Sequence, residues 1–141
     1  MSTTDATQLF GQEHVRRYRE TDGEEGHIWK EGSTILLLTT TGRNTGKETT
    51  TPLIYGMDGD NPVIVASQGG RPEHPQWYRN LTANPDTFVE IGADRRAVHA
   101  GTAGPDERAR LWPKLVELYA DFDNYQSWTD REIPVVVLKP R

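Results

Sequence analysis

The sequence predicts a single α+β domain built mainly on an antiparallel sheet of about six strands that closes, fully or partly, into a barrel. Short β-branched and apolar segments follow one another with tight turns between them, which is typical of antiparallel strands. The predicted helices are few, and the regular strand–helix alternation of a doubly wound parallel sheet is missing. A closed or partly closed barrel removes the exposed edges that such a sheet would otherwise present.

Composition narrows the possible functions. The 141 residues carry a formal net charge of −5 and no basic run, which argues against a nucleic-acid partner. The chain has no cysteine, and its four histidines show no ligand spacing, so we predict no metal site. No apolar run approaches the roughly 20 residues of a membrane span. We therefore expect a cytoplasmic protein without stable membrane insertion, and the sequence leaves its oligomeric state open, a homodimer included.

The chain begins with a predicted surface helix and loop over residues 1–31, followed by the barrel over residues 32–141. Asp5 can cap a helix that runs to about Glu20. Residues 21–32 are charged, aperiodic and contain glycine, which indicates a loop.

The barrel segment contains strand and helix signals in an order that fixes the fold class. Strands are predicted at residues 33–38, 49–55, 63–66, 87–91, 95–100 and 133–138, with a turn at 56–62. Helices are predicted from Pro75, at its first position, to just before Asn84, from Gly104 through Pro113, which must kink or restart the helix, and over residues 122–129.

The loop at residues 41–47 has the composition of an anion-binding site. Gly42 and Gly46 permit positive φ and a close approach of the backbone to a ligand, and Arg43 and Lys47 add positive charge. A plain hairpin turn is the alternative, because glycine, asparagine and threonine are common turn residues. The loop is not a nucleotide P-loop, since only three residues separate the two glycines and no helical pattern follows.

A second stretch favours the anion-binding interpretation. Gly69 and Gly70 follow directly on the third predicted strand and lead into the helix that Pro75 begins. The N-terminus of a helix offers unpaired amides and a favourable dipole to a negative group. Two such features at strand ends predict a cleft for a negatively charged ligand.

Four blocks of sequence carry a further signal. They are Thr-Thr-Gly-Arg-x-Thr-Gly-Lys at 40–47, Ala-Ser-x-Gly-Gly at 66–70, His-Pro-x-Trp-Tyr-x-Asn-Leu-x-Ala-Asn-Pro at 74–85 and Tyr-Gln-Ser-Trp-Thr-Asp-Arg-x-Ile-Pro-Val-Val at 125–136. In this order they resemble the deazaflavin-dependent nitroreductase family of actinobacteria, from about Gly32 to Pro140. The resemblance implies a split β-barrel of the FMN-binding type and the cofactor F420, an 8-hydroxy-5-deazaflavin. It also implies hydride transfer from reduced F420 to a quinone, nitro or other activated unsaturated acceptor.

The resemblance also implies a site. Coenzyme contacts are expected from Arg43, Asn44, Thr45, Lys47, Thr49, Thr50, Thr51, Pro52, Leu53, Ile54, Val65, Ala66, Ser67, Gln68, Gln76, Trp77, Tyr78, Arg79, Asn80 and Tyr125. Tyr125 is expected to face the ring and the small-molecule acceptor, in a substrate pocket completed by Phe122 and Trp128. We assign Tyr125, helped by Ser67 or by main-chain amides, to proton donation and to stabilisation of charge on the acceptor oxygen. The alternative for Tyr125 is an aromatic stripe that packs the last helix onto the barrel.

Three expected coenzyme contacts depart from the family pattern. Relatives commonly carry lysine where Asn44 stands, arginine where Thr49 stands and lysine where Gln68 stands. We therefore expect weaker coenzyme binding with less dependence on the length of its acidic tail. Two other functions stay open: an FMN-dependent oxidoreductase on the same barrel, and a coenzyme-binding protein that is not an enzyme.

Overall fold

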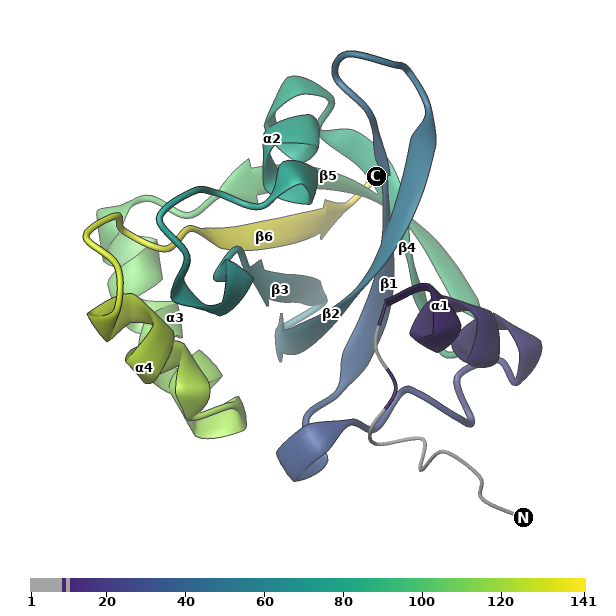
Figure 1. The fold of residues 1–141 in the computed structure, drawn as a ribbon, viewed down its shortest axis with the longest axis horizontal. Coiled ribbons are helices and arrows are strands. Elements are labelled where there is room, and N and C mark those ends of the chain that lie inside the picture. Colours follow the sequence, from purple (N-terminus) through teal and green to yellow (C-terminus); the bar gives the residue numbers. More distant parts are fainter. Residues whose placement is uncertain (1–8, 10) are drawn as a thin grey trace.

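The structure, a computed structural model, describes Leu9 and residues 11–141 and shows six antiparallel strands closed into a barrel (Figure 1). The strands are β1 (Ile35–Thr41), β2 (Glu48–Asp58), β3 (Asn61–Val65), β4 (Asp86–Ile91), β5 (Asp94–Thr102) and β6 (Val135–Pro140). Around the barrel their order is β1-β2-β3-β6-β5-β4, and the pairing of β1 with β4 closes it. The predicted fold class is confirmed.

Strand β1 is buried on both faces, which is why its sequence is apolar without alternation. Leu36 and Leu38 belong to the main core, together with buried side chains of the other strands. Ile35 and Leu37 pack in a second cluster with Val15 of the N-terminal helix. Because both faces of the strand are covered, it contains a continuous run of buried residues rather than an alternating pattern.

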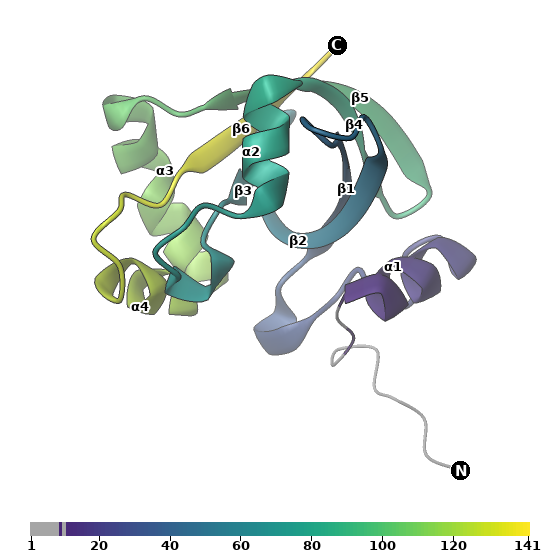
Figure 2. The ribbon, with the colours of Figure 1, turned by 45° about the horizontal axis from the view of Figure 1, so that its top comes forward.

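Four α-helices surround the barrel. They are α1 (Gly11–Glu20), α2 (Gln76–Ala83), α3 (Pro105–Leu118) and α4 (Asp121–Ser127). Figure 2 shows α1 and the α3–α4 pair on opposite sides of the barrel, with α2 between them. No helix in the described part of the chain is long and apolar enough to cross a membrane. The cytoplasmic location stays a prediction.

Tyr18 fixes α1 to the barrel. Its hydroxyl donates a hydrogen bond to the Ile35 carbonyl (3.0 Å) and accepts one from the Gly92 amide (2.7 Å). Burial raises the pKa of Tyr18 to about 12, so the hydroxyl stays protonated at neutral pH. The boundary predicted after residue 31 stays a prediction, but the core of α1 is shared with β1.

Several predicted boundaries were wrong or cannot be compared. Strand β2 runs on to Asp58 and β3 begins at Asn61, so the turn predicted at 56–62 is only two residues long. Gly59, at φ +61°, supplies the left-handed conformation that such a tight hairpin needs. Strand β6 begins two residues later than predicted, at Val135. The predicted helix start at Asp5 lies outside the described residues.

The proline positions also need correction. Pro75 is the residue before α2 rather than its first residue. Helix α3 continues through Pro113, so of the two predicted outcomes the restart does not occur and the kink stays a prediction. Pro113 and Ala109, whose carbonyl loses its helical partner there, are both exposed, so water can satisfy that carbonyl.

A half-buried histidine makes stability depend on pH. His27, in the loop after α1, has its Nε2 atom 2.9 Å from the Tyr55 hydroxyl, and burial lowers the pKa of His27 below its usual 6.5. As the pH falls through about 6.5, the unfolded chain therefore takes up a proton before the folded chain does, and the free energy of unfolding falls until the folded-state pKa is passed. Urea unfolding at a series of pH values should show this loss.

The matched variant is His27→Gln, which cannot titrate at this position. It should lose less stability than the unmodified protein over the same pH range. Some loss should persist, because burial and the nearby Arg131 and Arg79 also lower the pKa of His74. Equal losses in both proteins would contradict the assignment to His27.

Candidate active site

A cavity of about 610 Å³ lies where β2, the turn after β3, α2 and α4 meet. Most of the predicted site residues line it: Thr49, Thr51, Pro52, Leu53, Ile54, Val65, Ser67, Gln68, Gln76, Trp77, Asn80, Phe122 and Tyr125. The sequence therefore predicted the walls contributed by β2, α2 and α4. The described residues contain no group of three or more His, Asp or Glu side chains that could hold a metal ion.

Other predicted residues lie outside the cavity lining: Arg43, Asn44, Thr45, Lys47, Thr50, Ala66, Tyr78, Arg79 and Trp128. The Thr50 hydroxyl is hydrogen-bonded to Thr39 (2.9 Å), and that of Tyr78 to Thr102 (2.7 Å). Trp128 is 67% exposed at the end of α4, with its ring centroid 5.7 Å from that of Tyr125. The roles assigned to all of these residues stay predictions.

Arg43 connects the loop between β1 and β2 to α2. Its guanidinium donates to Asn80 Oδ1 (2.8 Å) and to Gln76 Oε1 (2.9 Å), and its backbone amide donates to Asn80 Oδ1 (3.2 Å). Both acceptors line the cavity. The Arg43 guanidinium thus lies next to Gln76 and Asn80, two wall residues of what we call the polar end of the cavity.

The turn after β3 has an unusual backbone. Gln68, Gly69 and Gly70 are all left-handed, with φ of +45°, +61° and +79°, and Ser67 before them is right-handed. A right-handed residue followed by a left-handed one aligns successive amides into a concavity that suits an anion. The amides of Ser67, Gln68 and Gly69 donate to no acceptor in the described part of the chain, and all three residues line the cavity.

Arg131 holds this turn in place. Its half-buried guanidinium donates to the carbonyls of Ser67 (2.7 Å), Arg71 (2.9 Å) and Ala66 (3.1 Å). Arg131, which precedes β6, therefore provides hydrogen-bond donors for the carbonyls of the turn. Its positive charge also favours a negative ligand at the turn.

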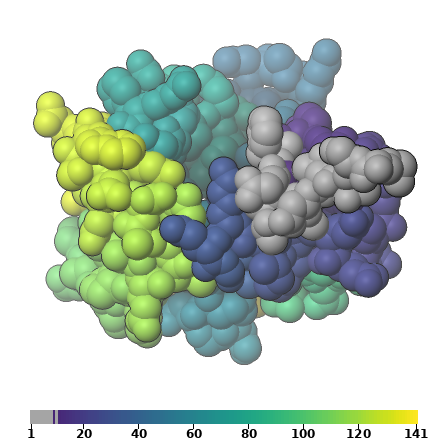
Figure 3. All heavy atoms as spheres, turned by 60° about the horizontal axis from the view of Figure 1, so that its bottom comes forward, coloured from purple at the N-terminus to yellow at the C-terminus, as the bar shows by residue number. Residues whose placement is uncertain are grey.

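The other end of the cavity is aromatic. Tyr119 is buried, and its ring centroid lies 5.2 Å from that of Phe122 and 6.4 Å from those of Tyr125 and Trp29. Burial and the neighbouring Tyr125 raise the pKa of Tyr119 well above its usual value. Figure 3 shows the segment after α1, in blue, against the α3–α4 layer, in lime. The stacking of Trp29 on Tyr119 joins these two parts of the chain.

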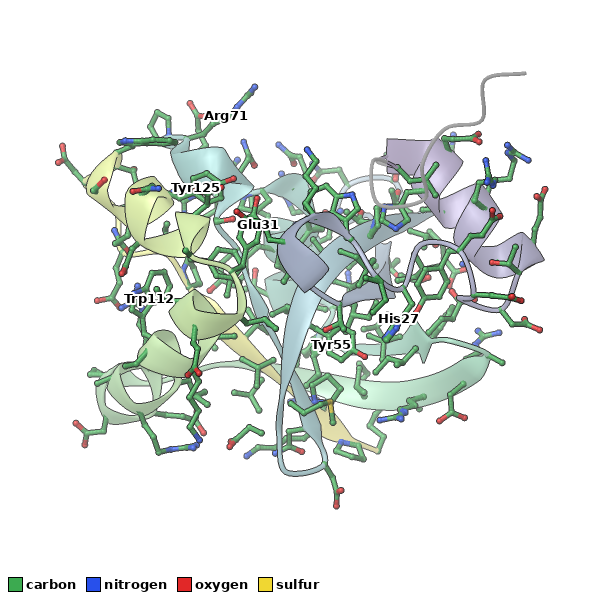
Figure 4. The ribbon with its side chains drawn as sticks, turned by 90° about the horizontal axis from the view of Figure 1, so that it is seen from below. His27, Glu31, Tyr55, Arg71, Trp112 and Tyr125 are labelled. Atoms are coloured by element: carbon green, nitrogen blue, oxygen red, sulfur yellow. The ribbon has the colours of Figure 1, made fainter. Side chains whose placement is uncertain are left out.

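Asp121 and Glu31 place negative charge near the aromatic end. Figure 4 shows Glu31, in the 3₁₀ turn Lys30–Gly32, on the side of that turn that faces α4, while Arg71 points away into solvent. The negative charge of Glu31 contributes to the raised pKa of Tyr119. One end of the cavity is thus rich in hydrogen-bond donors and lies next to Arg43 and Arg131, and the other end is aromatic.

Part of the lining was missed by sequence reasoning: Gly11, His14, Trp29, Ile35, Thr40, Gly69, Pro75 and Tyr119. Gly11, His14 and Trp29 precede the region of family resemblance, and only their packing against distant segments brings them to the site. The indole of Trp29, for example, donates to the Leu9 carbonyl (2.6 Å) while its ring packs on Tyr119. The pair Gly69–Gly70 is part of the predicted anion signal, but the predicted contact set does not include Gly69.

Comparison with known proteins decides the family. The family model for F420H(2)-dependent quinone reductases matches residues 10–140. The chain belongs to the F420H(2)-dependent quinone reductase family.

Individual relatives agree with this assignment. The F420H(2)-dependent quinone reductase Rv1261c of Mycobacterium tuberculosis (strain ATCC 25618 / H37Rv) is 47% identical over 131 residues, which are 91% of this chain and 88% of that protein. Rv3178 of the same strain is 57% identical over 106 residues, 75% of this chain and 89% of the relative. The solved F420-H2 dependent reductase FDR-A has 39% identity and a TM-score of 0.69, covering 74% of this chain and 93% of that one. A solved domain-swapped dimer has 36% identity and a TM-score of 0.71, covering 91% and 96%.

Membership of the F420H(2)-dependent quinone reductase family confirms the broad functional predictions. The protein is an oxidoreductase, its cofactor is coenzyme F420, and its reaction is hydride transfer from the reduced coenzyme to a quinone. The finer prediction, a nitroreductase specificity, is a proposal.

Proposed function

We propose that the cavity holds F420 with its acidic part at the polar end and its ring along β2, and that the acceptor enters at the aromatic end beside Tyr125. The observation that carries this proposal is the two-ended lining of a single cavity. Unpaired amides at Ser67, Gln68 and Gly69, together with Arg43, fit a phosphodiester and a carboxylate tail. The aromatic end fits a flat, uncharged acceptor.

When bound, reduced F420 supplies the hydride, and the protein supplies orientation, charge stabilisation and protons. The Tyr125 hydroxyl donates the proton that the acceptor oxygen takes up, and Ser67 helps to stabilise the negative charge on that oxygen. Phe122 and Tyr119 shield the acceptor from water. A nitro group develops negative charge on oxygen as a quinone does, so we extend the proposal to nitro acceptors.

Titration of the purified protein with F420 and, in parallel, with FMN tests the coenzyme assignment. Oxidation of reduced F420 by menadione, and then by a nitroaromatic compound, tests the acceptors. Tight binding of F420 with turnover supports the proposal. Binding of FMN instead would favour the FMN-dependent alternative, and F420 binding without any turnover would favour a coenzyme-binding protein that is not an enzyme.

A gain of affinity is expected from Gln68→Lys. Gln68 lines the polar end, and a lysine there adds a charge next to the proposed phosphate position. A shielded charge-assisted hydrogen bond contributes about 1.5–3 kcal/mol, and an exposed ion pair contributes about 0–1 kcal/mol. Because position 68 is half-buried, we expect an effect between these two values, which is a decrease in Kd of about three- to tenfold. Fluorescence titration at low and high salt should show tighter binding and a steeper salt dependence.

Asn61→Lys is the matched control for Gln68→Lys. It adds the same charge at the first residue of β3, the end of that strand farthest from the turn that carries Gln68. Its Kd should stay within about twofold of that of the unmodified protein, because solvent and salt screen a charge so far from the turn. Equal gains in both variants would mean that overall charge, and not contact at the turn, sets the affinity.

A domain-swapped dimer among the related structures supports a homodimer as the assembly. We propose that this chain is also a homodimer. Light scattering on the purified protein distinguishes the dimer from the monomer.

A further inference from the structure

Thr40 lines the cavity, and its hydroxyl has no partner among the described residues. Its side chain is 1% exposed, and Oγ1 makes no hydrogen bond with any described residue. Among the described residues it is the one buried side-chain polar atom in this condition. Buried hydroxyls in folded proteins are nearly always hydrogen-bonded, so an unsatisfied one at a cavity wall needs an explanation.

The neighbouring threonine shows that the strand itself does not impose this condition. Thr39 is also buried, but its hydroxyl is hydrogen-bonded to that of Thr50 on β2 (2.9 Å). Successive side chains of a strand point to opposite faces, so Thr40 faces away from this pair. In the β1–β2 register it stands opposite Thr49, which also lines the cavity.

The surroundings of Thr40 are those of the polar end. Thr49, Thr51, Gln76 and Asn80 line the same cavity, and the side-chain oxygens of Gln76 and Asn80 already accept from Arg43. A hydroxyl can both donate and accept, so it can pair with a carbonyl, a ring nitrogen, a hydroxyl or a phosphate oxygen of a ligand.

From this geometry we propose that the Thr40 hydroxyl is a direct hydrogen-bonding partner of the coenzyme in the cavity. The apo protein leaves a buried polar group unsatisfied, and binding satisfies it. The contact therefore contributes to affinity at the expense of the stability of the free protein. This inference rests on the proposed location of F420 and adds a residue outside the predicted contact set.

The test is a pair of valine substitutions on adjacent residues, with binding and stability measured separately. Thr40→Val keeps the shape of the side chain and removes the unsatisfied hydroxyl. It should leave the urea midpoint of the free protein unchanged or higher, and weaken F420 binding about tenfold in a fluorescence titration. Thr39→Val removes a satisfied hydroxyl that does not face the ligand, so it should lower the midpoint and leave the Kd within about twofold.

Thr40→Ser provides a rescue, because it restores the hydroxyl without the methyl group. Its Kd should return to within about threefold of that of the unmodified protein. A deazaflavin that lacks the phosphodiester tail then locates the contact: equal weakening by Thr40→Val places it on the ring or its polyol chain, and weakening for F420 alone places it on the phosphate. Unchanged F420 binding in Thr40→Val would overturn the inference and leave a buried water as the partner of the hydroxyl.

Failure of the proposed location can be told apart from failure of the inference. Thr51→Trp fills the cavity and should abolish F420 binding, with Ser67→Trp as a second blocking variant if the first does not fold. If folded blocking variants bind F420 normally, the coenzyme lies elsewhere. If they lose binding while Thr40→Val keeps it, the location stands and the role of Thr40 is refuted.

Discussion

Replacing Gly70 with alanine is expected to destabilise the protein by about 2–4 kcal/mol. At φ +79°, any side chain at this position is strained. A Cβ here would lie 2.8 Å from the carbonyl oxygen of Tyr125 and 3.0 Å from its Cα. These are backbone atoms of α4 and cannot rotate away, so either the turn or the helix must move.

Gly69→Ala separates the two contributions, because the adjacent position has similar strain and no neighbour. Its φ is +61°, and a Cβ would meet nothing within 4 Å. It should therefore cost only the left-handed conformation, about 1–2 kcal/mol. Urea unfolding of both variants measures the difference, and equal losses would show that the contact between the turn and α4 does not constrain either element.

Gly70→Ala should also affect coenzyme binding and turnover. Gly70→Ala moves the turn that carries Ser67 and Gln68 relative to the helix that carries Tyr125, so it should raise the Kd for F420 and lower turnover together. The contacts of Arg131 with the turn carbonyls oppose this movement from one side only. The turn thus packs directly on α4, and this contact sets the position of the polar end of the cavity relative to the aromatic end.

Local sequence was sufficient for the individual elements, and insufficient for what joins them. The β-branched and apolar runs predicted all six strands, and the glycine pair at 69–70 predicted free amides for an anion after the third strand, because both signals depend on neighbouring residues alone. The prediction assigned those amides to the start of the next helix, whereas the structure has them in the turn itself, at residues 67–69. Where β2 and β6 begin or end depends on partner strands, so those boundaries shifted by a few residues. Thr40 is buried, and its hydroxyl lacks a partner among the described residues, only because of how the barrel is assembled. No local sequence pattern predicts either property.

The site divides in the same way. The four sequence blocks and the strand β2 between the first two of them supply much of the lining, and these walls were predicted because the blocks resemble a family whose site is known. The wall formed by His14 and Trp29 comes from the segment that precedes those blocks. Its contact with Tyr119 joins residues 90 positions apart in the chain, a separation that periodicity and spacing do not reach.

Tyr125→Phe is expected to lower kcat about 100-fold and to leave the Kd for F420 within twofold, since a positioned general acid contributes on the order of 10²–10⁴. Phenylalanine keeps the ring contacts with Tyr119, Phe122 and Trp128 and removes only the hydroxyl. If Tyr125 served only to pack α4 onto the barrel, the substitution would therefore change neither turnover nor stability. Unchanged turnover with menadione would refute the role assigned to Tyr125.

Tyr119→Phe is the matched control for this assignment, because Tyr119 also lines the cavity and carries the same chemical group. Burial and its neighbours raise the pKa of Tyr119, which makes its hydroxyl a weaker acid and a poorer proton donor. Its loss should lower kcat by no more than about threefold, since a group outside proton transfer contributes only through packing and a single neutral hydrogen bond. A large loss in Tyr119→Phe with a small one in Tyr125→Phe would reverse the two roles and move proton donation to the wall that the N-terminal segment covers. Comparable large losses in both would instead mean that the two hydroxyls act as a unit, which the double variant would show by losing no more activity than either single variant.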